Sequence, residues 1–168
     1  MNITMYQASV PRFANMLGNL SRILDKAQAY ATQKAFDGAV LADSRLYPDM
    51  LPLSSQGQIA CDTAKGAVAR LAGIDIPVHE DNERTLPELK ARIAKTIAFI
   101  ESVRQDEVDG SEEREIVIRR GDEELRFTGL QFLLGRALPN FYFHVSTAYA
   151  ILRHNGVAIG KRDYLYNA

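Results

Sequence analysis

Two polar side chains near the end of the chain have the spacing of a chemical site. Asn140 and His144 stand four residues apart, so they project one turn apart on one face of a helix. An imidazole beside an amide can bind a metal ion or serve in acid–base chemistry. A buried histidine that hydrogen-bonds a polar neighbour is the common structural alternative, and the two residues leave both interpretations open.

A second polar pair, Gln58 and Asp62, has the same spacing in an earlier helical pattern. The two side chains could point into a shared cavity or into water, and Lys65 could pair with Asp62 at the surface. If the fold brought Asp62 within about 3 Å of His144, the two could form an acid–base pair. Cys61 is a poor nucleophile candidate, because a lone cysteine beside an apolar face is usually inert packing.

The helix that carries Asn140 and His144 is predicted to run from Thr128 to Gly156. Thr128 and Gln131 form a capping box at its start, and Asn155-Gly156 ends it. Pro139 predicts a kink or distorted turn just before Asn140. The apolar stripe that should face the core has steps of three and four residues and comprises Leu134, Leu138, Phe141, Val145, Ala148 and Leu152.

Three further helices precede this one, and an alternating pattern separates the last two. The helices are predicted over Val10 to Gln33, Leu53 to Leu71 and Thr85 to Val103. The segment REIVIRRGDEELRFTG alternates apolar and polar residues on both sides of Gly121-Asp122, which predicts a β-hairpin. We therefore expect an all-α fold, a four-helix bundle with a small β-hairpin between helices three and four, as a single domain over residues 1–168. Tyr164 and Tyr166 could dock the tail on the bundle.

Composition narrows the class of protein. The chain has 168 residues, of which 46% are hydrophobic and 24% charged, with a formal net charge of −1. These values predict a globular protein with no general attraction to nucleic acid or to anionic membranes. A single cysteine excludes an intrachain disulfide, and no stretch has the length of a membrane span or the pattern of an export signal. A cytoplasmic location is expected.

Four segments also resemble a known family. RLYPDMLPL, QIACDTAKGAVARLAG, PNFYFHVSTAYAILRHNG and GKRDYL resemble a bacterial family of unknown function in the DinB/YfiT-like superfamily, whose members are proposed metalloenzymes. The resemblance extends over nearly the whole chain. It implies a DinB-like helical bundle, a homodimer, and an enzyme of the hydrolase or thiol-transferase type.

Members of that superfamily typically carry one histidine on the second helix and an H-x-x-x-H pair on the fourth. The resemblance puts His144 at the second histidine of the pair and Asn140 at the first, while Gln58 or Asp62 fills the place of the missing histidine. We expect His144, Asp62 and Asn140 to line one pocket, with Gln58 at its edge. A divalent metal such as zinc or nickel should bind there weakly or be absent, because oxygen donors replace two imidazoles.

Two functions of different classes follow. In the first, the pocket binds a divalent metal or a small-molecule ligand, and the protein is a metal-dependent enzyme. In the second, the protein is a non-catalytic oligomerising bundle in which Asn140, His144 and Asp62 form a structural hydrogen-bond network. The hairpin and the small residues of the second helix would then make the subunit contacts of a homodimer.

Overall fold

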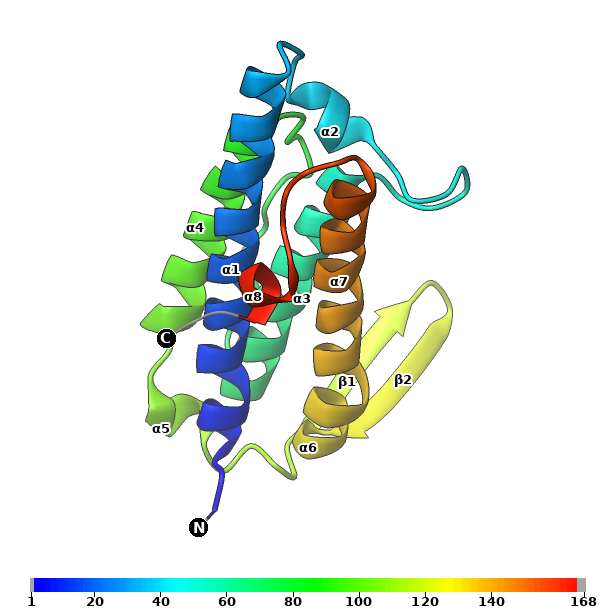
Figure 1. Cartoon of the computed structure of the whole chain (residues 1–168). Helices are drawn as coiled ribbons and strands as arrows, with labels where there is room; N and C mark the ends of the chain where they lie inside the picture. The colour runs from blue at the N-terminus through cyan, green and yellow to red at the C-terminus, as the bar shows by residue number, and fades with distance from the viewer. Residues whose placement is uncertain (1, 166–168) are drawn as a thin grey trace.

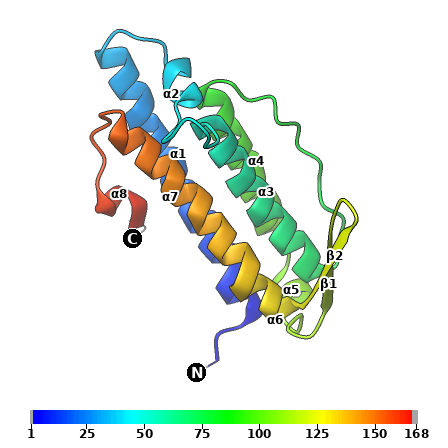
Figure 2. The same cartoon turned by 90° about the vertical axis from the view of Figure 1, so that its right-hand side faces the viewer.

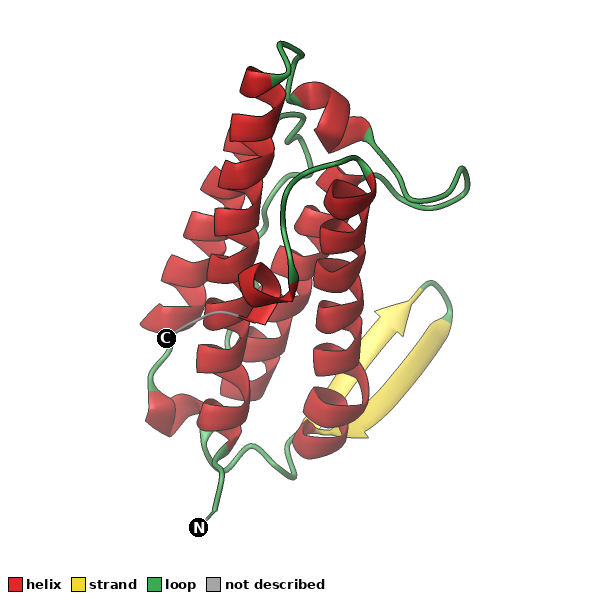
Figure 3. Ribbon diagram, in the orientation of Figure 1, coloured by secondary structure: helices red, strands yellow, loops and turns green. Residues whose placement is uncertain are grey.

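Helices dominate the computed structural model, which describes residues 2–165 except the side chain of Arg120 (Figure 3). Four of the helices are long: α1 (Met5–Gln33), α3 (Leu53–Ala72), α4 (Leu86–Ser102) and α7 (Leu138–His154). α1 packs against α4 and α7, and α3 packs against the same two helices, so the core lies between all four (Figure 1). A mostly helical fold with a hairpin before the last long helix is therefore confirmed.

The apolar pattern predicts that the first long helix begins at Val10, but the helix begins at Met5. Thr4 and Gln7 form a capping box that fixes this earlier start. Pro11 lies inside the helix and cannot donate to the carbonyl of Gln7. The side chain of Arg12 does so instead, with its Nε 3.2 Å from the Gln7 oxygen, so the proline is accommodated without ending the helix.

The second and third long helices lie close to their predicted bounds. α3 ends at Ala72 and is capped by Gly73, which takes the left-handed conformation with φ of 71°. α4 begins with the predicted capping box between Thr85 and Glu88. The face of α3 turned to its neighbours is built from small buried residues, among them Ala60, Ala64 and Ala67, which allow close approach of α7.

The predicted hairpin is also confirmed, as β1 (Glu115–Arg120) and β2 (Glu123–Thr128). The strands are antiparallel, with Ile116 opposite Phe127 and Ile118 opposite Leu125, so the apolar side chains share one face. The hairpin lies beside the short helix α6 (Gly129–Phe132), at one end of the long helices (Figure 2). That position makes it one wall of the cavity described below.

The last helical segment is interrupted before Pro139, as predicted. A π-helical turn, η1 (Leu133–Ala137), separates α6 from α7, and the Leu138 amide donates to the carbonyl of Leu133. The extra residue in this turn shifts the apolar stripe by one position. Leu133 is buried, whereas Leu134, which the stripe places in the core, is 53% exposed. The prediction for Leu134 is therefore wrong, and the π turn is the reason.

Three short helices complete the described part of the chain: α2 (Ala39–Asp43), α5 (Gln105–Val108) and α8 (Lys161–Leu165). α8 carries the predicted docking of Tyr164, whose ring meets Tyr149 with centroids 5.9 Å apart. The Tyr164 hydroxyl also lies 2.8 Å from the Ser146 hydroxyl. Tyr166 lies outside the described residues. Among the described helices, none has the length and apolar character needed to cross a membrane.

Candidate functional site

His144 projects from α7 into the seam with α3, and its partner there is Gln56. The residue is 8% exposed, and its Nδ1 lies 2.7 Å from the Gln56 side-chain oxygen. Since that oxygen can only accept, Nδ1 donates. Gln56 in turn donates from Nε2 to the carbonyl of Leu51 at 3.0 Å. Burial lowers the pKa of His144, so the imidazole is neutral at pH 7.

Asn140 lies on the same face of α7, one turn earlier, and contacts a different residue of α3. Its Nδ2 donates to the hydroxyl of Thr63 at 2.8 Å. The two helices are antiparallel, because the later residue of α7 faces the earlier residue of α3. Asn140 and His144 therefore share a face, as predicted, but each hydrogen-bonds its own partner.

The two α3 residues predicted for the site point away from His144. The Asp62 carboxylate lies 2.9 Å from both Lys65 Nζ and Arg92 Nη2. Gln58 donates from Nε2 to the Glu83 carboxylate at 3.0 Å, toward the connection between α3 and α4. The acid–base pair of Asp62 and His144 is thus not formed, since the carboxylate is held by two cations.

A cavity of about 220 Å³ nevertheless joins two of the four predicted residues. It opens between α3, the hairpin and the π turn, and its lining comprises Asp62, Thr63, Arg70, Ile118, Phe132, Arg136, Ala137 and Asn140. Neither His144 nor Gln58 is among the described residues that line this cavity. The structure therefore brings Asp62 and Asn140 together and leaves His144 and Gln58 outside this cavity.

Gln56 is the site residue that sequence reasoning missed. Positions 56 and 58 differ by about 200° around a helix, so a choice between them decides which neighbour the side chain faces. A signal was present, because Gln56, Ala60 and Ala64 follow one another at steps of four residues. Extending the apolar face of α3 backwards by one turn reaches Gln56, and Gln58 falls on another side.

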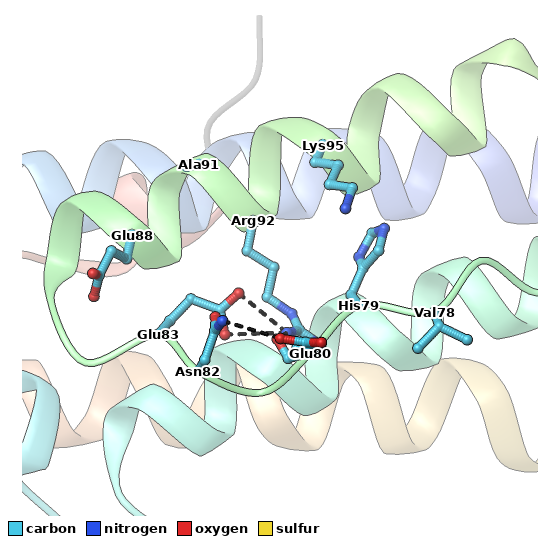
Figure 4. Close-up of a pocket in the computed structure, with 9 residues that line it drawn as sticks. All are labelled: Val78, His79, Glu80, Asn82, Glu83, Glu88, Ala91, Arg92 and Lys95. Carbon is cyan, nitrogen blue, oxygen red and sulfur yellow. Dashed lines mark hydrogen bonds and ion pairs between the residues drawn. The ribbon is translucent and has the colours of Figure 1, made fainter.

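Arg92 organises a second cluster, in a groove of about 540 Å³ between α4 and residues 78–83 (Figure 4). The guanidinium is almost fully buried and contacts the carboxylates of Asp62 and Asp81 at 2.9 Å and Glu83 at 3.1 Å. It also donates to the carbonyl of Glu80 at 2.8 Å. Burial opposes the charged form, but Asp62 and Glu83 outweigh it and raise the pKa of Arg92. This cluster holds the connection between α3 and α4 against both of these helices.

His79 lies in the same groove, near Lys95 (Figure 4). Its Nδ1 is buried and has no hydrogen-bond partner within the described part of the chain. Burial and the charges of Lys65 and Lys95 lower the pKa of His79. The side chain is thus partly enclosed, which its position in a polar connection does not predict.

Cys61 is buried in α3, and burial raises the pKa of its thiol to about 12. A thiol with such a pKa is protonated at neutral pH and is a poor nucleophile. This agrees with the prediction of inert packing.

Comparison with known proteins identifies the family. Residues 5–165 match a domain of unknown function, DUF1993. The chain belongs to the DUF1993 family. A crystal structure of a DinB family member protein from Shewanella denitrificans is 45% identical, with a TM-score of 0.87 over 97% of this chain and 92% of that one. Among curated proteins, none matches the chain.

The resemblance to DinB proteins implies a divalent-metal site, so the possible ligands in this structure must match those that such an ion requires. Within the described residues, no group of three or more His, Cys, Asp or Glu side chains could hold an ion. The seam offers one imidazole, which already bonds Gln56, and the neutral amides of Gln56 and Asn140. Neutral amides are weak ligands for zinc or nickel. This arrangement does not fit a tightly held resident ion.

Proposed function

We propose that this DinB-like four-helix bundle is a small-molecule-binding protein whose site is the cavity between α3, η1 and α7. The observation that carries the proposal is the convergence of Asp62, Thr63 and Asn140 on one solvent-accessible cavity of about 220 Å³. Polar groups that converge in a partly apolar cavity are typical of ligand sites. In this proposal, His144 and Gln56 hold the α3–α7 seam and do not touch the ligand.

The structural role of His144 is supported by its surroundings. Its imidazole is buried, neutral and hydrogen-bonded, and Gln56 passes the contact on to the backbone at Leu51. Such a chain of satisfied polar groups fixes the register of two helices. The oligomerising alternative requires His144, Asn140 and Asp62 in one network, whereas these three side chains contact three separate partners, Gln56, Thr63 and Arg92.

A weak divalent-metal site remains the second candidate, because Asp62 and Asn140, whose side chains both carry an oxygen donor, line the same cavity. Binding through His144, Asp62 and Asn140 would require the Gln56 and Lys65 contacts to open. Calorimetric titration with zinc, nickel and manganese tests this candidate. A saturable heat that disappears in His144→Ala would support the metal site, and the absence of a heat in the unmodified protein would remove it.

The ligand-binding proposal can be tested by thermal shift with a panel of small anionic, cationic and neutral aromatic fragments. Asn140→Leu replaces an exposed amide that lines the cavity and contacts Thr63 by a branched apolar side chain. Asn82→Leu is the matched control, since Asn82 is also exposed but lines the Arg92 groove. We expect at least one fragment class to raise the melting temperature of the unmodified protein and of Asn82→Leu, but not of Asn140→Leu.

Two outcomes would contradict the proposal. In one, no fragment class stabilises the unmodified protein. In the other, stabilisation survives in Asn140→Leu and disappears in Asn82→Leu, which would move the site to the groove beside His79 and Lys95.

A further inference from the structure

Two arginines from different elements line the cavity. Arg70 extends from α3 and Arg136 from the π turn, and both are half-buried. Arg70 is held in place by its Nη1, which donates to the carbonyl of Gly66 at 3.0 Å. Among the described residues, no carboxylate forms an ion pair with Arg70 or Arg136. The two arginines therefore line the cavity without an ion-pair partner in the described part of the chain.

Like charges this close oppose each other. Burial lowers the pKa of Arg70, and the charge of Arg136 lowers it further. Asp62 also lines the cavity, but its carboxylate is paired with Lys65 and Arg92, each at 2.9 Å, and it is a single negative charge against two guanidinium groups in the lining. The cavity consequently keeps an excess of positive charge, which an anion would relieve.

The remaining walls select the size and shape of such an anion. Ile118 from the hairpin and Phe132 from α6 supply an apolar side. Thr63 and Asn140 supply a hydroxyl and an amide at the α3–α7 seam. The volume of about 220 Å³ is below the roughly 300–1,000 Å³ of sites for drug-sized ligands. The cavity thus suits a small amphiphilic molecule.

We propose that the cavity binds a small organic oxyanion, a carboxylate or phosphate joined to a compact apolar group, with the oxyanion between Arg70 and Arg136. Planar guanidinium groups bind such oxygens through paired, charge-assisted hydrogen bonds. The apolar group would lie against Ile118 and Phe132. This inference rests on the ligand-binding function proposed above and assigns it a ligand class.

Calorimetric titration of the full chain with phenyl phosphate and benzoate tests the proposal, with benzyl alcohol as the neutral probe. Arg136→Met removes one guanidinium. Gly66→Ala keeps every charge but displaces the guanidinium of Arg70, because a Cβ at Gly66 would lie 2.6 Å from Arg70 Nη1. Arg153→Met is the control, since this exposed arginine lies about 25 Å along the helix from Arg136 at 1.5 Å per residue.

We expect saturable binding of at least one anionic probe, and weaker or undetectable binding of benzyl alcohol. Arg136→Met should weaken binding of the anion by about tenfold or more, the usual loss for a hydrogen bond to a charged group. Gly66→Ala should weaken it as well, without lowering the melting temperature, because alanine favours a helix. Arg153→Met should bind like the unmodified protein.

The outcomes separate the two proposals. If benzyl alcohol binds as well as the anions, or if Arg136→Met and Gly66→Ala bind the anions undiminished, the oxyanion inference is overturned. The ligand-binding function would still stand if binding of the neutral probe were lost in Asn140→Leu. If none of the probes binds and the fragment panel also fails, both proposals fall.

Discussion

Replacing the buried Arg92 by methionine should destabilise the protein more than replacing any exposed charged side chain. The change removes a buried cation and leaves the carboxylates of Asp62, Asp81 and Glu83 close together. Breaking a buried ion pair on one side costs about 3–5 kcal/mol. The side chains of Asp62 and Asp81 are 38% and 61% exposed, so water screens them, whereas Glu83 is only 11% exposed.

The cost should therefore lie near the lower end of that range, about 3 kcal/mol in unfolding free energy at pH 7. For a chain of this size, such a loss corresponds to a fall in melting temperature of roughly 6–12 °C. Urea unfolding followed by circular dichroism measures the free energy directly. Adding Glu83→Gln to Arg92→Met should restore part of the loss, because it removes the best-buried unpaired charge.

Arg104→Met is the control, because Arg104 forms an exposed ion pair with Asp106 and should be replaced without measurable effect. The reasoning would be refuted if Arg92→Met lost less than about 1 kcal/mol, the range of a surface pair. It would also be refuted if Glu83→Gln deepened the loss, since Glu83 would then not be the uncompensated charge.

Three further predictions concern titration, the thiol and assembly. Burial lowers the pKa of His144 below its ordinary value of 6.5, so the unfolded state binds this proton more readily. The unfolding free energy should be level above about pH 7 and fall as the pH drops through 6.5. Urea unfolding midpoints from pH 5 to 8 measure this dependence. In His144→Gln, the fall of unfolding free energy with pH should shrink to the part that His79 contributes. Cys61, with a pKa of about 12, should react with a thiol reagent only in denaturant, and rapid labelling of the folded protein would contradict its burial. Light scattering at micromolar concentration should give a homodimer, for which the exposed Phe143 offers apolar surface, and a monomer mass throughout would remove that expectation.

Local chemistry made the helices and the hairpin predictable. The capping boxes at Thr85 and Thr128 and the glycine at the end of α3 act within a few residues, so the sequence alone indicates those boundaries. The start of α1 was harder to place. Pro11 suggests an interruption, and only the Arg12 side chain, bonded to the Gln7 carbonyl, shows how a continuous helix tolerates it.

The site depended on the register between helices, which no single segment determines. The shared face of Asn140 and His144 followed from their spacing, but their partners on α3 did not. A shift of two residues along α3 exchanges Gln58 for Gln56 and reverses the direction of the side chain. Lys65 could be foreseen as a partner of Asp62 from its spacing, whereas Arg92 comes from another helix.

The π turn decides what lines the cavity. In an uninterrupted α-helix, Phe132 and Asn140 would differ by about 80° in direction, since eight residues turn by about 800°. One extra residue in the π turn removes about 100° from that rotation and leaves the two side chains within about 20°. Both consequently line the cavity, with Arg136 between them, while Leu134 is turned out to solvent. The missing amide hydrogen of Pro139, just after the turn, is consistent with this widened geometry. The π turn thus brings Phe132, from the apolar wall, and Arg136 to the same cavity.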